Sequence, residues 1–128
     1  MGASFPNKTL KSLPPNSNIV GTWIISFVIE RTKMKNIDWL LKEDITDDIY
    51  LSFLPKLDFP FIKLIVKSNG IVCYTSKIGS QITFFEGFPK KWDKYKVYLS
   101  ETLILNLYDR SYSDVITLNG YDLYKVCS

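Results

Sequence analysis

The feature of this sequence that most constrains its fold is a series of short segments in which apolar and polar residues alternate. Residues 62–67 alternate in this way, and Asn69-Gly70 follows them almost directly. A second Asn-Gly pair, Asn119-Gly120, stands between two further apolar segments near the end of the sequence. Alternation with a period of two is typical of a strand, and Asn-Gly favours a two-residue hairpin turn. The second half of the sequence therefore predicts antiparallel strands joined by hairpins.

Roughly eight strands of about five to ten residues follow from this pattern, arranged as a meander. The segments that predict them are residues 20–30, 62–67, 71–78, 81–86, 94–100, 103–107, 115–118 and 121–127. No long crossover separates any later pair, which disfavours a parallel sheet. About eight antiparallel strands suffice to close a small barrel, and closure would remove the exposed edges of the sheet. We therefore predict an all-β fold, a small antiparallel up-and-down barrel.

The first part of the sequence departs from the strand pattern. Between residues 34 and 43 the apolar residues recur at helical spacing, which predicts a short amphipathic helix after the first strand. Residues 44–60 show no clear period. Residues 1–17 are rich in Asn, Lys, Ser and Pro and predict an extended N-terminal arm. We accordingly place the barrel domain at residues 18–128.

Composition narrows the chemistry that such a barrel can perform. The sequence has 128 residues, of which 46% are hydrophobic, no histidine and two cysteines. Without imidazole there is no Ser-His-Asp triad, no Cys-His pair and no histidine-ligated haem. Two cysteines are too few for an all-cysteine zinc site. We therefore expect a protein that is not an enzyme and that uses neither a cofactor nor a metal.

The charge of the chain bears on its partners. A net charge of +3 is mild, whereas a dedicated duplex-binding domain carries a stronger and more clustered excess. The loop at residues 90–96 combines lysines with Trp92 and Tyr95, which suits single-stranded nucleic acid, an anionic membrane surface, or a solvated loop with Trp92 folded onto the barrel. Of these we favour the solvated loop, and we expect no nucleic-acid partner.

The sequence says less about the compartment in which the protein resides. No apolar run reaches the ~20 residues that a membrane-spanning helix needs. We expect a soluble protein, cytosolic as written, or secreted or lumenal if a leader has been removed.

The start of the first strand resembles a known family. Asn18-Ile19-Val20-Gly21-Thr22-Trp23 is similar to the N-x-x-G-x-W signature that opens the first strand of lipocalins and related calycins. The resemblance implies that Gly21 allows close backbone approach and that Trp23 plugs the closed end of the barrel beneath a ligand cavity. Lipocalins place a late arginine over this tryptophan. Here no arginine follows Arg110, so Lys125 in the final strand would take that position.

The helix after the first strand also looks like the fatty-acid-binding branch of this superfamily. That branch inserts helices between its first two strands and ends in an Arg-x-Tyr that grips a ligand carboxylate. The corresponding residues 121–125 contain no arginine, so the carboxylate clamp is not expected here.

Two hypotheses of function follow. In the first, the barrel binds a small apolar, lipid-like ligand in its cup, and burial of apolar surface supplies the affinity. One face of each strand would line this cup: Phe27, Leu64, Val66, Tyr74, Phe84, Tyr95, Val97, Leu105 and Leu107. The hydroxyl group of Tyr74 or Tyr95 would orient the ligand. The same side chains would equally fill the barrel as a solid core.

In the second hypothesis a filled barrel acts as a protein-interaction or accessory subunit. Its partner would meet the N-terminal arm, the helix at residues 34–43, or exposed aromatic residues such as Trp39 and Trp92. Cys73 and Cys127 lie in predicted strands, where a disulfide and two buried thiols remain equally open.

Overall fold

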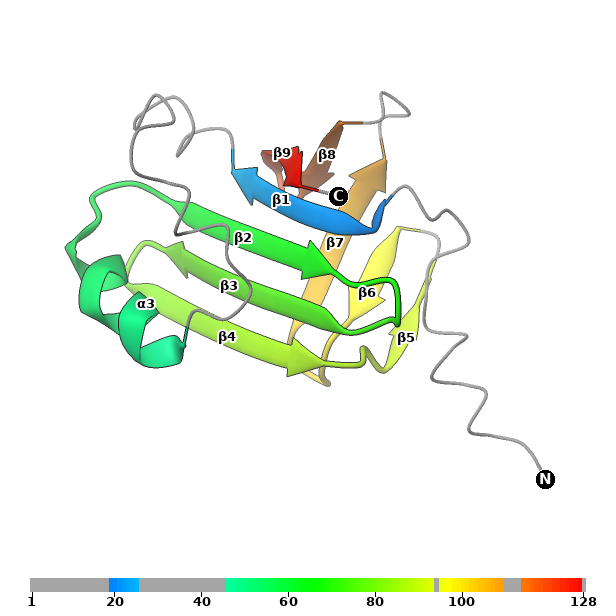
Figure 1. The fold of residues 1–128 in the computed structure, drawn as a ribbon, viewed down its shortest axis with the longest axis horizontal. Coiled ribbons are helices and arrows are strands. Elements are labelled where there is room, and N and C mark those ends of the chain that lie inside the picture. Colours follow the sequence, from blue (N-terminus) through cyan, green and yellow to red (C-terminus); the bar gives the residue numbers. More distant parts are fainter. Residues whose placement is uncertain (1–18, 26–45, 94, 110–113, 128) are drawn as a thin grey trace.

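The computed structural model describes residues 19–25, 46–93, 95–109 and 114–127 (Figure 1). In chain order the described elements are β1 (Gly21–Ile25), α3 (Asp47–Phe53), η3 (Leu54–Lys56), β2 (Phe61–Val66), β3 (Val72–Ile78), β4 (Gln81–Gly87), β5 (Lys91–Trp92), β6 (Lys96–Tyr98), β7 (Ile104–Asp109), β8 (Val115–Leu118) and β9 (Tyr121–Cys127). The predicted arm at residues 1–17, the predicted helix at residues 34–43, and the positions Phe27 and Trp39 lie outside the described residues.

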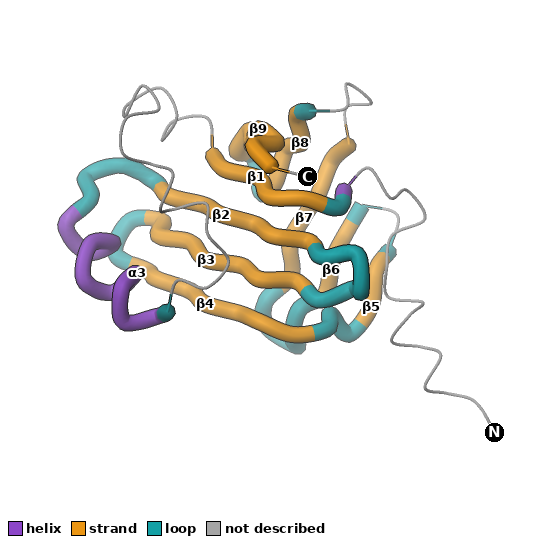
Figure 2. Tube along the Cα trace, in the orientation of Figure 1, coloured by secondary structure: helices purple, strands orange, loops and turns teal. Residues whose placement is uncertain are grey.

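The described strands form one antiparallel sheet of nine strands, in the order β4-β3-β2-β1-β9-β8-β7-β6-β5. The sheet curls into a half-barrel, with β1 to β4 in the near half and β5 to β9 behind them (Figures 1 and 2). The all-β, antiparallel, barrel-like fold with a short helix after the first strand is therefore confirmed. Closure is not observed among the described strands, because β4 and β5 stand at the two ends of the sheet.

Both Asn-Gly pairs lie in hairpin turns. Asn69-Gly70 belongs to a three-residue loop between β2 and β3, in which the Lys67 N–H donates to the Ile71 carbonyl at 2.9 Å. Asn119-Gly120 forms the expected two-residue turn between β8 and β9. Asn119 has a φ of 50° and Gly120 a φ of 89°, the positive values that a tight hairpin of this kind requires. Asn119 also joins the turn to β7, because the backbone N–H of Asn106 donates to Asn119 Oδ1 at 2.8 Å and the Asn119 N–H donates to the Asn106 carbonyl at 2.8 Å. The β8–β9 hairpin is thereby held against a neighbouring strand at its tip.

Strand register divides the side chains between a concave inner face and a convex outer face. On the inner face Trp23 lies opposite Leu64, and Leu64 lies opposite Tyr74. Most inner-face side chains converge in one core, and many of them are only 0% to 4% exposed: Trp23, Ile25, Leu64, Val66, Val72, Tyr74, Val97, Leu105, Ile116, Leu118 and Leu123.

The outer face differs between the two halves of the sheet. In the half formed by β5 to β9 the outer face is open to solvent. Tyr108 on β7 is 55% exposed and Tyr124 on β9 is 44% exposed. In the near half all six residues of β2 are buried, and so are all five of β1. The strand β1 is therefore covered on both faces.

The helix α3 packs on the outer face of the near half. Thr46 occupies its N-cap, Asp47 and Asp48 stand in the first turn, where carboxylates favour the helix dipole, and Pro55 ends it. The ring of Tyr50 lies 6.2 Å from that of Phe61 and 6.0 Å from that of Phe84. A helix of seven residues is too short to be stable alone, so this packing is what holds it.

Replacing Asn119 tests the anchored hairpin. Asn119→Ala should lower the free energy of unfolding by about 1–2 kcal/mol, since it loses the side-chain bond to Asn106 and since alanine tolerates a positive φ less well than asparagine does. Asn119→Gly should lower it by only about half as much, because glycine tolerates this φ. Denaturant unfolding checks both values. Equal losses in the two variants would show that φ contributes nothing.

Candidate functional site

The residues predicted to line a cup divide into two groups. Leu64, Val66, Tyr74, Val97 and Leu105 lie on the inner face and are buried in the core, and Leu107 is partly buried against them. Phe84 and Tyr95 do not lie on the inner face. Phe27 lies outside the described residues.

The prediction is wrong for Phe84 and Tyr95. Phe84 pairs with Thr75 and Phe85 pairs with Tyr74, so Phe85 takes the inner face and Phe84 the outer one. Tyr95 is 50% exposed, and its ring lies 6.1 Å from that of the exposed Tyr108. Neither side chain can line an interior cavity.

The interior is packed at the described positions. A hollow large enough for water would leave its lining side chains partly accessible, yet the described cup-lining residues Leu64, Val66, Tyr74, Val97 and Leu105 are only 1% to 4% exposed. Burial raises the pKa of Tyr74, while a hydrogen bond to the Ser76 side chain opposes that shift. Because Ser76 satisfies the hydroxyl of Tyr74, this group has no need of a ligand.

Trp23 stands at the junction of the two halves of the sheet. It is 1% exposed, and its Nε1 donates to the Ile19 carbonyl at 2.9 Å. Lys125 Nζ lies 5.5 Å from the centre of the indole ring, within the range of a cation–π contact. Gly21 has a φ of 143°, which favours glycine. The structure thus gives Lys125 the place over the tryptophan that the family resemblance implies.

A small cavity lies on the outer face, beneath α3. Its volume is about 170 Å³, and the described residues that line it come from α3, β2, β3 and β4: Asp47, Tyr50, Lys63, Ile65, Cys73, Tyr74, Thr75, Phe84, Phe85 and Glu86. Drug-sized ligands occupy roughly 300–1,000 Å³. This cavity therefore suits a single side chain or a molecule of a few heavy atoms.

In this cavity, called the outer pocket below, the positive group and the negative groups lie at different depths. Lys63 is 2% exposed and its Nζ lies 5.8 Å from the centre of the Tyr50 ring, so this cation belongs to the floor. Asp47 and Glu86 are exposed and belong to the mouth. Burial raises the pKa of Tyr50 to about 12, with smaller upward effects from Cys73 and Asp47, and a hydrogen bond with Thr75 opposes the shift. Tyr50 is therefore a neutral hydroxyl at physiological pH.

The strand β4 borders this pocket and also ends the sheet. It pairs with β3 at all seven of its positions, from Val72–Gly87 to Ile78–Gln81. On its other side no described strand pairs with it. Figure 1 shows β4 as the lower border of the near half. The backbone of β4 thus presents an unpaired edge directly beside the outer pocket.

The prediction of Trp92 as an interface residue required an exposed side chain. The structure instead shows Trp92 partly buried. It pairs with Val97, so it lies on the inner face, and it packs half-buried against the core. Its Nε1 is buried and has no hydrogen-bond partner within the described part of the chain. The alternative that the sequence offered, a tryptophan folded onto the barrel, is the one observed.

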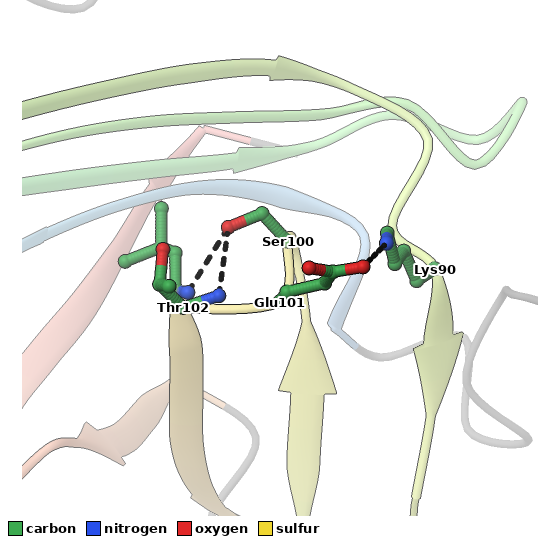
Figure 3. A network of polar contacts seen from close by, with 5 residues as sticks. Lys90, Ser100, Glu101 and Thr102 are labelled. Carbon is green, nitrogen blue, oxygen red and sulfur yellow. Dashed lines mark hydrogen bonds and ion pairs between the residues drawn. The ribbon is translucent and has the colours of Figure 1, made fainter.

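In the basic loop near Trp92, two lysine side chains contact neighbouring residues of the same protein. Lys90 Nζ lies 3.3 Å from Glu101 Oε1, and Ser100 Oγ accepts the backbone N–H groups of Thr102 and Leu103 beside it (Figure 3). Lys91 Nζ lies 4.6 Å from the centre of the Tyr98 ring. These contacts tie Lys90 and Lys91 to neighbouring side chains on β6 and in the turn that follows it.

Cys73 and Cys127 lie three strands apart. Cys73 stands opposite Ile65, Ile65 opposite Thr22, and Thr22 opposite Cys127. With neighbouring strands about 4.8 Å apart, the two Cα atoms are separated by on the order of 12 to 14 Å, whereas a disulfide needs less than about 7 Å. The register excludes a disulfide between them.

Comparison of the chain with protein-family models, with curated proteins and with solved structures finds no match. The lipocalin resemblance of the opening motif therefore stays a prediction. The described ranges contain no cluster of three or more Cys, Asp and Glu side chains placed to hold a metal ion. Nor does any helix in them have the length and apolarity needed to cross a bilayer.

The raised pKa of Tyr50 predicts a pH-dependent effect on stability. The unfolded tyrosine ionises near 10.0 and the folded one near 12, so the stability that comes from keeping the hydroxyl neutral is present below pH 10 and is lost between these values. Tyr50→Phe should therefore cost about 1 kcal/mol at pH 8, from the lost bond to Thr75. At pH 11 the natural protein should lose about 1.4 kcal/mol that the variant keeps, so the variant should become the more stable by roughly 0.4 kcal/mol.

Urea unfolding of both proteins at the two pH values measures this difference. A deficit that is constant for Tyr50→Phe would contradict the raised pKa.

Proposed function

We propose that this chain is a non-enzymatic protein-interaction module that binds an extended segment of a partner along the unpaired edge of β4. The observation that carries the proposal is the edge itself, seven residues long and without a paired strand in the described part of the chain. An extended peptide can add to such an edge as a further antiparallel strand. Its main chain then supplies hydrogen bonds, and side chains on either face supply selectivity.

The two ends of the sheet contrast in how well they are protected. Natural edge strands are blunted by shortness, lysine, proline or a bulge. The strand β5 follows this rule, because it has two residues and one of them is Lys91. By contrast β4 contains neither lysine nor proline, and its register with β3 is unbroken. A regular, unprotected edge favours a role in pairing.

The side chains of β4 also suit a bound strand. Ile82 and Phe84 on the outer face and Phe85 on the inner face are only partly buried. A segment paired with β4 would cover them further, and cross-strand apolar pairs contribute roughly 0.2–1 kcal/mol each. Apolar contacts on both faces would thus add to the main-chain hydrogen bonds.

The packed interior is what favours this function over a ligand cup. Five of the side chains predicted to line a cup, Leu64, Val66, Tyr74, Val97 and Leu105, are only 1% to 4% exposed and so offer little accessible surface to a lipid-like ligand. Binding of a small apolar ligand in the cup stays a prediction. A lipophilic fluorescent probe that gains emission on binding, and loses it in a variant with an inner-face leucine enlarged, would restore that hypothesis.

Backbone pairing can be tested with a peptide rather than with a protein variant. A random nine-residue peptide library would be panned against the protein, and the tightest binder synthesised in two forms. One form carries N-methyl groups on its odd-numbered amides, the other on its even-numbered amides. Because only alternate amides of an edge-paired strand face β4, one form should lose binding by about tenfold or more and the other should keep it.

Hydrogen exchange in the complex should show new protection within Gln81–Gly87. The proposal is wrong if no peptide is enriched, if the two methylated forms bind alike, or if the protection falls elsewhere.

A further inference from the structure

The outer pocket and the unpaired edge of β4 are adjacent, and this adjacency points to the chemistry of the partner. Phe84 and Glu86 of β4 line the pocket from the sheet, and Asp47 and Tyr50 line it from α3. A strand added to β4 would lie about 4.8 Å away, with its outer-face side chains directly opposite Phe84 and Glu86. One of those side chains therefore stands at the mouth of the pocket.

We infer that the partner segment carries a basic side chain, arginine or lysine, which enters the mouth of the outer pocket between α3 and β4. This inference rests on the proposed function. It adds to strand pairing a side-chain specificity that the edge alone does not provide.

Charge complementarity supports a basic side chain. The charged groups exposed at the mouth are the carboxylates of Asp47 and Glu86. The nearby Lys77 is partly buried and its Nζ donates to the Leu57 carbonyl at 2.7 Å, so its charge is held away from the mouth. An acidic side chain would meet two carboxylates there, whereas a basic one would pair with them.

The walls and the floor define how far the side chain enters. The rings of Tyr50 and Phe84 lie 6.0 Å apart and offer apolar surface for the aliphatic stem of arginine or lysine. Lys63, 2% exposed, places a positive charge on the floor. A volume of about 170 Å³ leaves room for one such stem.

A second copy of this chain fits the edge less well. Two β4 strands paired antiparallel about Phe84 would place Glu86 of each copy opposite Ile82 of the other, since positions equally distant from the centre face each other. The mouth of each pocket would then receive no positive charge from the other β4. A basic segment satisfies both the edge and the pocket.

The test uses the peptide selected for binding to β4, synthesised with Arg, Lys, Gln or Glu at each outer-face position in turn. At one position the Arg and Lys peptides should bind about tenfold more tightly than the Glu peptide at low salt. In the doubly substituted protein Asp47→Asn/Glu86→Gln this preference should fall to about threefold or less. The control Asp48→Asn, an exposed carboxylate of α3 that does not line the pocket, should keep it.

The outcomes separate this inference from the proposed function. If alternate N-methylation still discriminates but no position prefers a basic residue, or if Asp48→Asn removes the preference as well, strand pairing holds and the basic-side-chain inference is wrong. If N-methylation does not discriminate, the proposed function itself is wrong. If the protein dimerises with rising concentration and the peptide dissociates the dimer, a second copy is the occupant and the inference is overturned.

Discussion

The structure depends on β1 being paired on both sides. Its five residues are buried, and β1 is the strand that joins β2 to β9 and so unites the two halves of the described sheet. Trp23 fixes this junction, because its indole N–H is satisfied by the Ile19 carbonyl and its ring lies beneath Lys125 Nζ. If β1 were displaced, the described sheet would divide into β2–β4 and β5–β9, each with an exposed inner face.

The junction at β1 brings the inner faces together but leaves the ends of the sheet apart. Packing on the inner face is complete enough that the core takes no part in the proposed function. The function that we propose lies instead on the outer face, in the half of the sheet that α3 covers. There a small pocket, a buried lysine and an unpaired strand lie beside one another. Protein recognition is the activity that such an edge supports.

Sequence patterns predicted what is local and missed what depends on long-range packing. The Asn-Gly hairpins and the antiparallel strands that they join follow from neighbouring residues, and both were found. Phe84 and Phe85 are adjacent and equally apolar, so the pattern cannot say which faces inward. The helix α3 has seven residues and is held by tertiary contacts of Tyr50, which no periodicity reports. Whether β4 and β5 pair depends on how strongly the whole sheet curves, so the sequence of either segment alone does not predict it.

The most direct measurement is residue-resolved amide hydrogen exchange on the free protein. The amides of β2 and β3, paired on both sides, should be protected throughout. In β4 protection should alternate, with the amides that bond to β3 slow and those that face outward as fast as in a loop. Uniform protection across Gln81–Gly87 would mean that the edge is already paired, and it would contradict the account.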